Sequence, residues 1–323
     1  MTSKEGEQKT GFDMAKIKEK IEKKLKGGTI PDYETERHAV TDTSESDKLA
    51  QILEQRAPAK HMVGTLRKKN GAKAERHVVT GVSGFDNLFE YGVPKGSNVI
   101  IAGGPGSGKT IFCLQMLAHH ASLGKKCFYM SFEESKEGLI EHMKDFGWNP
   151  EKLINSDNLK IKKYLSSDIH YLDRADSIEA MFAKEEDSQL IELEPISLQL
   201  GFKLDFIVLD SLTAIASAFE EKEQSYRFYA ERLFNFFKNL GSTNFLITET
   251  RMIPEVFSPT GTEEFLADGV IVLYNIRREN IRESAIEVLK MRGAKHQRKI
   301  VAMQITDEGI VVYPEQEVFG GID

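Results

Sequence analysis

The chain has 323 residues, with 40% hydrophobic and 29% charged side chains, which is the composition of a soluble globular protein. This length accommodates one large domain with an appendage, or two small domains. The formal net charge of −7 combines +3 in residues 1–75 with −10 in the remainder, and an acidic main domain argues against tight nucleic-acid binding outside a local basic groove.

Two features of the sequence favour a reducing cytoplasm as the compartment. Cys113 and Cys127 both lie in apolar segments, and their spacing matches neither a metal site nor a disulfide framework. The amino terminus shows no apolar signal segment, and no apolar run is long enough to cross a membrane. We therefore expect a cytoplasmic protein without a membrane span.

Residues 1–75 form a charged, partly helical extension in this interpretation. Two short amphipathic helices are predicted, over residues 14–26 and 47–56, separated by polar stretches. Neither helix can bury a core of its own, so we expect them either to dock on the main domain or on a neighbour, or to remain mobile. The main domain then covers residues 76–323.

A phosphate-binding loop opens the main domain. The segment Gly103-Gly104-Pro105-Gly106-Ser107-Gly108-Lys109-Thr110 fits G-x-x-x-x-G-K-[ST]. An apolar run over 98–102 predicts a buried strand before it, and 111–118 predicts a helix after it. The glycines allow backbone N–H groups to turn towards a phosphate at the positive end of the helix dipole. Lys109 is expected to reach the β- and γ-phosphates of a nucleotide.

Strands and helices alternate along the rest of the domain, and strands dominate its end. This order predicts an α/β fold with a mostly parallel sheet flanked by helices and a β-rich, antiparallel C-terminal extension. A nucleotide is expected at the carboxyl ends of the parallel strands. The predicted strands are 126–132, 159–161, 205–210, 243–248, 269–276, 284–291, 300–305 and 310–312, and the predicted helices are 136–146, 177–184, a short one from Pro195, and 224–240 with seven apolar or aromatic positions including Phe228.

Carboxylates at strand ends supply the next candidates. Asp210 closes an apolar strand in the manner of a Walker B acid and is expected to hold Mg²⁺ together with the Thr110 hydroxyl. Glu133 and Glu134 follow another strand, where a carboxylate can orient and deprotonate the attacking water. Two adjacent acids at a strand end are equally typical of a solvated turn, so both interpretations stay open.

A third group of candidates is cationic. Lys290 and Arg292 are two residues apart on a predicted strand and therefore share a face, from which they can clamp a γ-phosphate in their own subunit or across an interface. His296 follows in the same segment, and Arg251 is a cation at another strand end. An ordinary exposed basic strand end would show the same spacing.

Taken together, these segments resemble the KaiC-like branch of the RecA superfamily of ATPases. The resemblance covers about residues 76–314 and includes the order of the motifs. Its most specific element is Lys-Met-Arg-Gly-x-x-His at residues 290–296. It rests further on Thr-Gly-x-x-Gly-Phe-Asp at 80–86, the phosphate-binding loop, Ser-Phe-Glu-Glu-Ser at 131–135, Phe-Gly-Trp at 146–148, Leu-Asp-Ser at 209–211 and residues 248–251.

The resemblance implies a RecA-like core in a hexameric ring, with ATP and Mg²⁺ at each subunit interface and slow turnover coupled to assembly or signalling. It implies Glu133 and Glu134 at the catalytic-base position, with Lys290 and Arg292 acting on the neighbour's γ-phosphate. It also implies an unidentified protein partner. The expected nucleotide-binding residues are Gly104, Gly106, Ser107, Gly108, Lys109, Thr110, Ile111, Asp210, Arg251 and His296.

The sequence also departs from the circadian protein for which the family is named, which has two tandem domains. Where the second of those domains carries its autophosphorylation site, this chain reads Glu-Glu-Phe-Leu-Ala-Asp at 263–268. No Ser/Thr pair stands there, which argues against self-phosphorylation. Residues 166–202 and the amino-terminal extension have no counterpart in the resemblance.

Three functions remain open at this point. The first is a ring-forming ATPase that hydrolyses ATP slowly, and the second is a non-hydrolysing assembly protein gated by ATP. The third is a recombinase-type ATPase dependent on single-stranded DNA, which needs basic, aromatic or glycine-rich loops facing the ring channel. The candidate loop at 252–261 contains one aromatic residue and no cation.

Overall fold

The computed structural model describes residues 73–165, 203–219, 223–251, 256–278 and 281–318. All of them belong to one compact unit that begins at His61. The helices predicted at 14–26, 47–56, 177–184 and from Pro195 lie outside the described residues, and the domain boundary at residue 76 stays a prediction. In the part of the chain that is described, no helix is long and apolar enough to span a membrane.

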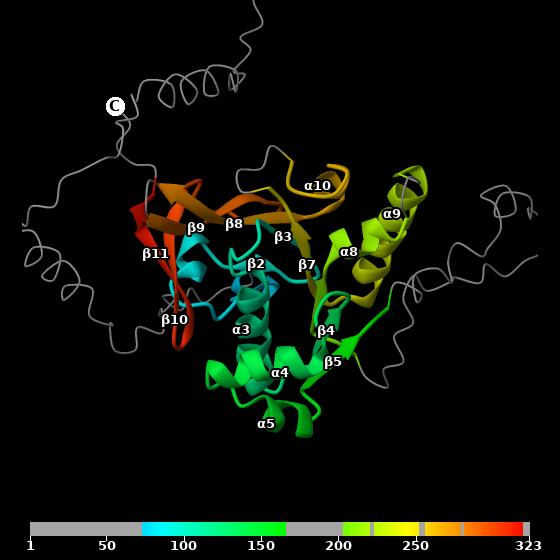
Figure 1. Ribbon diagram of the computed structural model, residues 1–323, viewed down its shortest axis with the longest axis horizontal. Coiled ribbons are helices and arrows are strands. Elements are labelled where there is room, and N and C mark those ends of the chain that lie inside the picture. Colours follow the sequence, from blue (N-terminus) through cyan, green and yellow to red (C-terminus); the bar gives the residue numbers. More distant parts are fainter. Residues whose placement is uncertain (1–72, 166–202, 220–222, 252–255, 279–280, 319–323) are drawn as a thin grey trace, which may run out of the picture. The chain divides into compact units, whose positions relative to one another are not determined.

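A nine-stranded sheet forms the centre of this unit (Figure 1), with the strand order β11-β10-β9-β8-β3-β7-β6-β4-β5. The strands from β8 to β5 in this order run parallel, and the neighbouring pairs β8–β9, β9–β10 and β10–β11 are antiparallel. The predicted parallel sheet with an antiparallel extension is therefore confirmed. The strands are β3 (Asn98–Gly103), β4 (Cys127–Ser131), β5 (Leu159–Lys163), β6 (Phe206–Asp210), β7 (Thr243–Glu249), β8 (Gly269–Arg278), β9 (Ile281–Met291), β10 (Val301–Thr306) and β11 (Gly309–Glu317).

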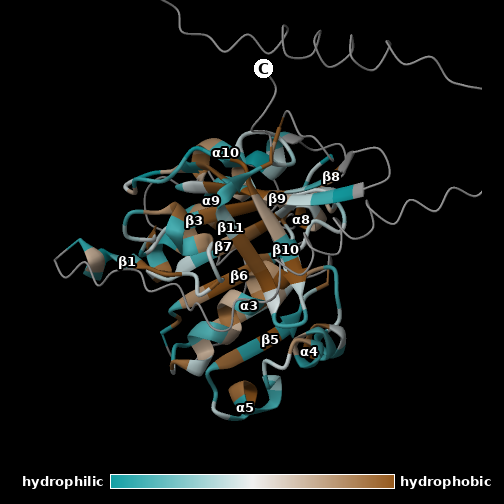
Figure 2. Cartoon of the chain, turned by 90° about the vertical axis from the view of Figure 1, so that its left-hand side faces the viewer, coloured by the Kyte–Doolittle hydropathy of each residue, from teal (hydrophilic) through white to brown (hydrophobic). Residues whose placement is uncertain are grey.

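Two hydrophobic cores, one on each face, explain why the central strands read as continuous apolar runs. Along β3, Val99 and Ile101 enter one core, whereas Ile100 and Ala102 enter the other. Figure 2 shows these strands as the hydrophobic centre of the unit. The first core contains α3 (Lys109–Ser122), α4 (Lys136–Asp145) and α5 (Pro150–Asn155), and the second contains α8 (Leu212–Ser217) and α9 (Glu223–Leu240).

The predicted amphipathic helix over 224–240 is α9, and its buried face includes only some of its apolar and aromatic positions. The buried positions are Tyr226, Tyr229, Leu233 and Phe237, which recur every three or four residues and form one face of the helix. Phe228 lies off this face and is 50% exposed.

The Thr80–Asp86 segment forms a turn closed by a carboxylate. The Asp86 carboxylate accepts hydrogen bonds from the backbone N–H of Thr80 (2.7 Å), the Thr80 hydroxyl (2.9 Å) and the backbone N–H of Gly81 (3.0 Å). Gly84 in the same turn has φ of 75°, and a Cβ there would lie 1.9 Å from the Val312 carbonyl oxygen. The turn thus packs the start of the domain against β11. Shorter elements are η1 (Ala74–Arg76), β1 (His77–Val78), η2 (Phe85–Leu88), β2 (Val93–Pro94) and α10 (Glu263–Leu266).

Candidate active site

The phosphate-binding loop leaves the carboxyl end of β3 and enters α3, as predicted. Gly106 and Gly108 adopt φ of 70° and 95°, in the left-handed region that glycine tolerates best. The nearest atom to a Cβ placed on Gly106 is Asn275 Nδ2 at 3.6 Å, so the positive φ, and not a lack of space, is what favours glycine at this position. The Ser107 hydroxyl is buried and has no hydrogen-bond partner among the described residues. Ile111 is half-buried and packs against the first core.

Lys109 is held inside this loop. Its side chain is 8% exposed, and its Nζ donates to the Gly104 carbonyl oxygen at 3.0 Å. Burial lowers the pKa of Lys109, while the negative charges of Glu249, Asp210 and Glu133 act in the opposite direction. The three carboxylates therefore favour the charged ammonium, which is the form that can bind a phosphate.

Asp210 stands at the end of β6 facing Thr110. The Thr110 hydroxyl donates to Asp210 Oδ2 at 3.4 Å, and the Tyr129 hydroxyl donates to the same oxygen at 2.5 Å. Burial raises the pKa of Asp210 to about 6, with the Tyr129 hydrogen bond and the Lys109 charge lowering it and Glu133 raising it. Sequence reasoning missed Tyr129 because it lies inside an apolar strand and carries no motif.

Glu133 and Glu134 point to different surroundings. The Glu133 carboxylate accepts a hydrogen bond from the Ser211 hydroxyl, next to Asp210. Glu134 forms a turn in which its backbone N–H and carbonyl oxygen both bond the Ser131 hydroxyl, and its carboxylate lies 3.5 Å from His142 Nε2 on α4. The structure thus brings Glu133, and not Glu134, to Asp210.

A further carboxylate that sequence reasoning left out is Glu249. It is the last residue of β7 and pairs in register with Gly103, the last residue of β3. The signal was available, because Glu249 follows an apolar strand as Asp210 does. The backbone N–H of Thr250 donates to the Gly103 carbonyl oxygen at 3.1 Å, so exposed Arg251 also follows directly at this edge.

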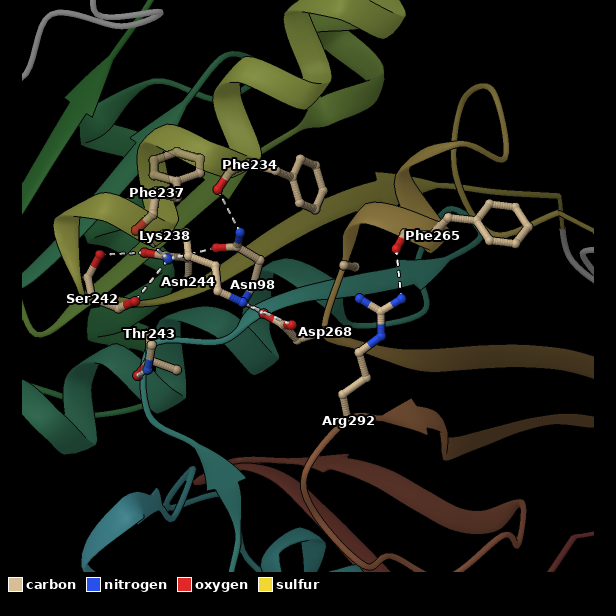
Figure 3. Close-up of polar contacts among 12 residues, drawn as sticks. Asn98, Phe234, Phe237, Lys238, Ser242, Thr243, Asn244, Phe265, Asp268 and Arg292 are labelled. Carbon is tan, nitrogen blue, oxygen red and sulfur yellow. Dashed lines mark hydrogen bonds and ion pairs between the residues drawn. The ribbon is translucent and has the colours of Figure 1, made fainter.

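Lys290 and Arg292 lie at the amino ends of the parallel strands, opposite the carboxyl ends that hold the phosphate-binding loop. We call these two ends the amino edge and the carboxyl edge of the sheet. Lys290 Nζ donates to the carbonyl oxygens of Glu264 and Ala267, both at 2.8 Å, and Arg292 donates to the Phe265 carbonyl oxygen at 3.0 Å (Figure 3). These acceptors belong to α10 and the residue after it, which precede β8. Both cations therefore share a face, as expected, but they meet α10 rather than the phosphate-binding loop.

Strand register shows how far apart the two edges are. Asp268, just before β8, bonds Asn98 at the start of β3: Asn98 N–H donates to its carboxylate at 3.1 Å, and its own N–H donates to the Asn98 carbonyl at 2.8 Å. The Arg292 N–H donates to the Asp268 carbonyl at 2.7 Å. Arg292 thus lies level with Asn98, roughly 16 Å along β3 from Gly103 at about 3.3 Å per residue.

His296 lies with neither group. It forms an isolated antiparallel bridge with Phe89, and the two rings are 6.3 Å apart between centroids. Its Nδ1 lies 3.4 Å from the Ala294 carbonyl oxygen. Its Nε2 is buried and has no hydrogen-bond partner among the described residues. Its expected contact with a nucleotide stays a prediction.

The donor set fits a triphosphate with Mg²⁺. Thr110 and Asp210 offer hydroxyl and carboxylate oxygens, which are the ligands that Mg²⁺ prefers. Among the described residues there is no cluster of three or more His, Cys, Asp or Glu side chains that could hold a metal on its own. A metal at this edge would therefore need phosphate oxygens as well, as Mg²⁺ bound to a nucleotide does.

Comparisons with known proteins show the family to which the chain belongs. A family model described as "ATPase: KaiC" matches residues 78–317. The circadian clock oscillator protein KaiC of Prochlorococcus marinus subsp. pastoris is 30% identical over 239 residues, which are 73% of this chain and 45% of that protein. The KaiC of Synechococcus elongatus is 28% identical over 238 residues, covering 73% of this chain and 44% of its own length. This chain thus spans less than half of these curated relatives.

A solved structure extends the likeness to the fold. The crystal structure of a KaiC-like protein from the hyperthermophilic archaeon Pyrococcus horikoshii OT3 matches with a TM-score of 0.59 and 30% identity. The match covers 74% of this chain and 99% of that one, so a single domain accounts for nearly the whole archaeal protein. The chain therefore belongs to the KaiC family of ATPases and carries one KaiC/RecA-like ATPase domain.

Proposed function

We propose that this protein is a slow Mg²⁺-dependent ATPase whose active sites form between copies of the chain in a ring. ATP binds to the Gly103–Thr110 loop of one copy, and Lys290 and Arg292 of the adjacent copy contact its γ-phosphate. Binding favours assembly of the ring and hydrolysis reverses it. A further protein binds the assembled ring as its partner, and the ring acts in the cytoplasm.

One observation carries the proposal: the two cations are fixed at the edge of the sheet opposite their own phosphate-binding loop. Their bonds to α10 carbonyls hold both charged groups there. Arg292 is exposed, so its charge is available to another molecule. The loop edge meanwhile gathers the carboxylates Asp210, Glu133 and Glu249 around Lys109. A second copy that brings its cationic edge to this acidic edge completes the site and matches opposite charges.

The described residues then divide the chemistry among them. Lys109 binds the β- and γ-phosphates, and Thr110 and Asp210 hold the magnesium ion, which neutralises phosphate charge when bound. Glu133 is the candidate base, because its carboxylate lies beside Asp210 and can accept the proton of the attacking water. Lys290 and Arg292 of the adjacent copy stabilise the charge that develops on the γ-phosphate.

The second candidate, a non-hydrolysing assembly protein, is favoured by one contact. The Glu133 carboxylate is already bonded to the Ser211 hydroxyl. If that bond persists when ATP is bound, one carboxylate oxygen is unavailable to a water molecule. ATP would then stay intact and act as a switch for assembly.

Mixing two inactive variants tests the shared site. Lys109→Ala removes the lysine that binds phosphate, and Arg292→Ala removes the cation proposed to act on the neighbour. Each alone should release phosphate roughly 10³-fold or more slowly than the wild type. When the two are mixed in equal amounts before Mg·ATP is added, about a quarter of the sites combine an intact loop with an intact arginine, so about a quarter of the activity should return.

A surface arginine provides the control for the mixing experiment. Arg298→Ala changes another exposed arginine six residues further along and should leave turnover unchanged. A mixture without activity, or an Arg292→Ala variant with full activity, would overturn the shared site. Bound ATP without turnover in the wild type would select the non-hydrolysing switch. Turnover only with single-stranded DNA would select the recombinase-type ATPase.

A further inference from the structure

A tyrosine with a buried polar group contacts the carboxylate at the end of β6. The Tyr129 side chain is 0% exposed, and its hydroxyl donates to Asp210 Oδ2 at 2.5 Å. A phenylalanine would fill the same space in the first core without a polar atom. A hydroxyl buried away from water destabilises a fold unless it is paired. The pairing with Asp210 therefore calls for a role beyond packing.

The backbone brings these two groups together on rigid elements. β4 and β6 are adjacent and parallel, with Tyr129 opposite Val208 and Ser131 opposite Asp210. Val208 and Asp210 are two residues apart and so project from the same face of the sheet, the face that carries α3 and Tyr129. The Tyr129 side chain extends beyond Val208 towards the carboxyl end of β6, and its hydroxyl there contacts the Asp210 carboxylate.

The bonded oxygen is the one that also faces the phosphate-binding loop. Asp210 Oδ2 accepts from the Thr110 hydroxyl at 3.4 Å as well as from Tyr129. One donor thus comes from the sheet and the other from the first turn of α3. Two donors on one oxygen fix the rotation of the carboxylate, because any turn about its axis breaks at least one bond.

The surroundings of Asp210 explain why its carboxylate needs a hydrogen-bond donor. Asp210 is 4% exposed, so its carboxylate has to take its hydrogen bonds from donors within the chain rather than from bulk water. A hydrogen bond from a neutral donor stabilises the ionised carboxylate without adding a competing cation. The phenol of Tyr129 supplies this donor from inside the first core, with its hydroxyl 2.5 Å from Asp210 Oδ2.

We propose that Tyr129 is a positioning residue that orients Asp210 towards the magnesium ion of the bound nucleotide. The inference rests on the proposed function in so far as that function includes binding of Mg·ATP. It does not depend on hydrolysis, on a ring or on the base. Tyr129 acts only through Asp210 and touches no substrate.

Tyr129→Phe isolates the hydroxyl, because it keeps the ring that packs in the core. We would titrate Mg²⁺ against the full chain with a fluorescent ATP analogue and repeat the binding in EDTA. The Mg²⁺ concentration for half-maximal binding should rise roughly tenfold, the smaller effect known for loss of a partner behind a metal ligand. Affinity in EDTA should stay at the wild-type value, and turnover at saturating Mg²⁺ should stay within a few-fold of it.

Tyr274→Phe is the matched control, since Tyr274 is also buried and also donates to a carboxylate, that of Glu287. Its Mg²⁺ dependence should equal that of the wild type. An unchanged Mg²⁺ titration in Tyr129→Phe would overturn the inference, and so would an equal loss of affinity in EDTA, which would indicate a packing role. A wild-type chain that binds no Mg·ATP would overturn the proposed function, and this inference with it.

Discussion

Two adjacent glutamates show how much a single residue step changes at the end of a strand. The chain turns immediately after β4, so that Glu133 turns towards Ser211 and Glu134 turns back towards α4. The same turn is fixed by the Ser131 hydroxyl, which bonds both backbone groups of Glu134. Glu133 and Glu134 have the same side chain, so only the geometry of this turn distinguishes their roles.

Substituting the two glutamates separately tests that assignment. Glu133→Gln keeps the size of the side chain and removes the base, so turnover should fall roughly 10²- to 10⁴-fold while ATP still binds. Glu134→Gln should change turnover by no more than a few-fold, since its carboxylate faces His142. Phosphate release and nucleotide binding measured on both variants decide the matter. Equal losses in the two, or a loss confined to Glu134→Gln, would contradict the geometry.

At the scale of an element, α3 joins the site to the turn that opens the domain. Lys109 and Thr110 form its first turn, and His120 lies near its last. The His120 side chain is 5% exposed, its ring stacks on Phe206 with centroids 3.8 Å apart, and its Nε2 donates to the Val79 carbonyl oxygen at 2.9 Å. The end of α3 is therefore held by a histidine that must stay neutral.

This histidine predicts a loss of stability in mild acid. Burial lowers the pKa of His120 to about 4, with the neighbouring His119 acting in the same direction. The unfolded chain, with a pKa near 6.5, takes up the proton first, so the contribution of His120 is complete above about pH 6.5 and is lost as the pH falls towards 4. Between pH 7.5 and 5.0 the loss amounts to about 2 kcal/mol of unfolding free energy.

Urea unfolding of His120→Gln at the two pH values measures that contribution. Glutamine can still donate to the Val79 carbonyl but does not titrate, so its stability should fall by about 2 kcal/mol less than that of the wild type over this interval. Loss of the ring stacking lowers stability at both pH values and cancels in the comparison. A His120→Gln variant whose stability falls by as much as that of the wild type over this interval would refute the assignment.

Elements with a strong local signal were predictable from the sequence, and those defined by tertiary contacts were not. Apolar runs located β3, β4, β6 and β7 to within a residue or two, because strands buried on both faces need such runs. The four-residue α10 has no periodicity to reveal it. It is fixed by contacts that include Lys290 Nζ on its carbonyl groups and Glu263, whose carboxylate accepts from the Thr260 hydroxyl at 3.0 Å.

The candidate site divides in the same way. The loop, Asp210 and the strand-end acids were visible as motifs, and the structure brings Lys109, Thr110, Asp210 and Glu133 together. Tyr129 and the placement of Lys290 and Arg292 were not visible, because they depend on strand order. Only the pairing of β9 with β8, and of β8 with β3, reveals that the two cations lie at the edge opposite the loop.

For the whole molecule, the two edges of one sheet have complementary properties. The carboxyl edge holds the loop and three carboxylates, and the amino edge holds Lys290, Arg292 and α10. Asp268 fastens the amino edge: it bonds Asn98 of β3, Lys238 of α9 at 3.1 Å and the backbone of Arg292 (Figure 3). In the proposed ring, β3 would connect the nucleotide of its own site to the cations that enter the next one.

An exposed aromatic side chain on this amino edge tests the proposed assembly. Phe265 is 77% exposed, lies on α10 beside the carbonyl groups that Lys290 and Arg292 bind, and directs its ring away from Arg292 (Figure 3). It buries little within its own chain, so Phe265→Ala should leave the free energy of unfolding within about 0.5 kcal/mol of the wild type. At an interface, loss of an aromatic anchor costs more than about 1.4 kcal/mol, which is a tenfold change in affinity.

We therefore expect Phe265→Ala to require at least roughly ten times more protein to assemble in Mg·ATP, as measured by sedimentation over a concentration series. Phe228→Ala is the control, because Phe228 is an exposed aromatic residue on α9, and it should assemble as the wild type does. Turnover per chain should fall with assembly in Phe265→Ala and recover at high protein concentration, since its catalytic groups are intact. Wild-type assembly by Phe265→Ala would show that subunits do not meet at α10, and the two cations would then need another partner.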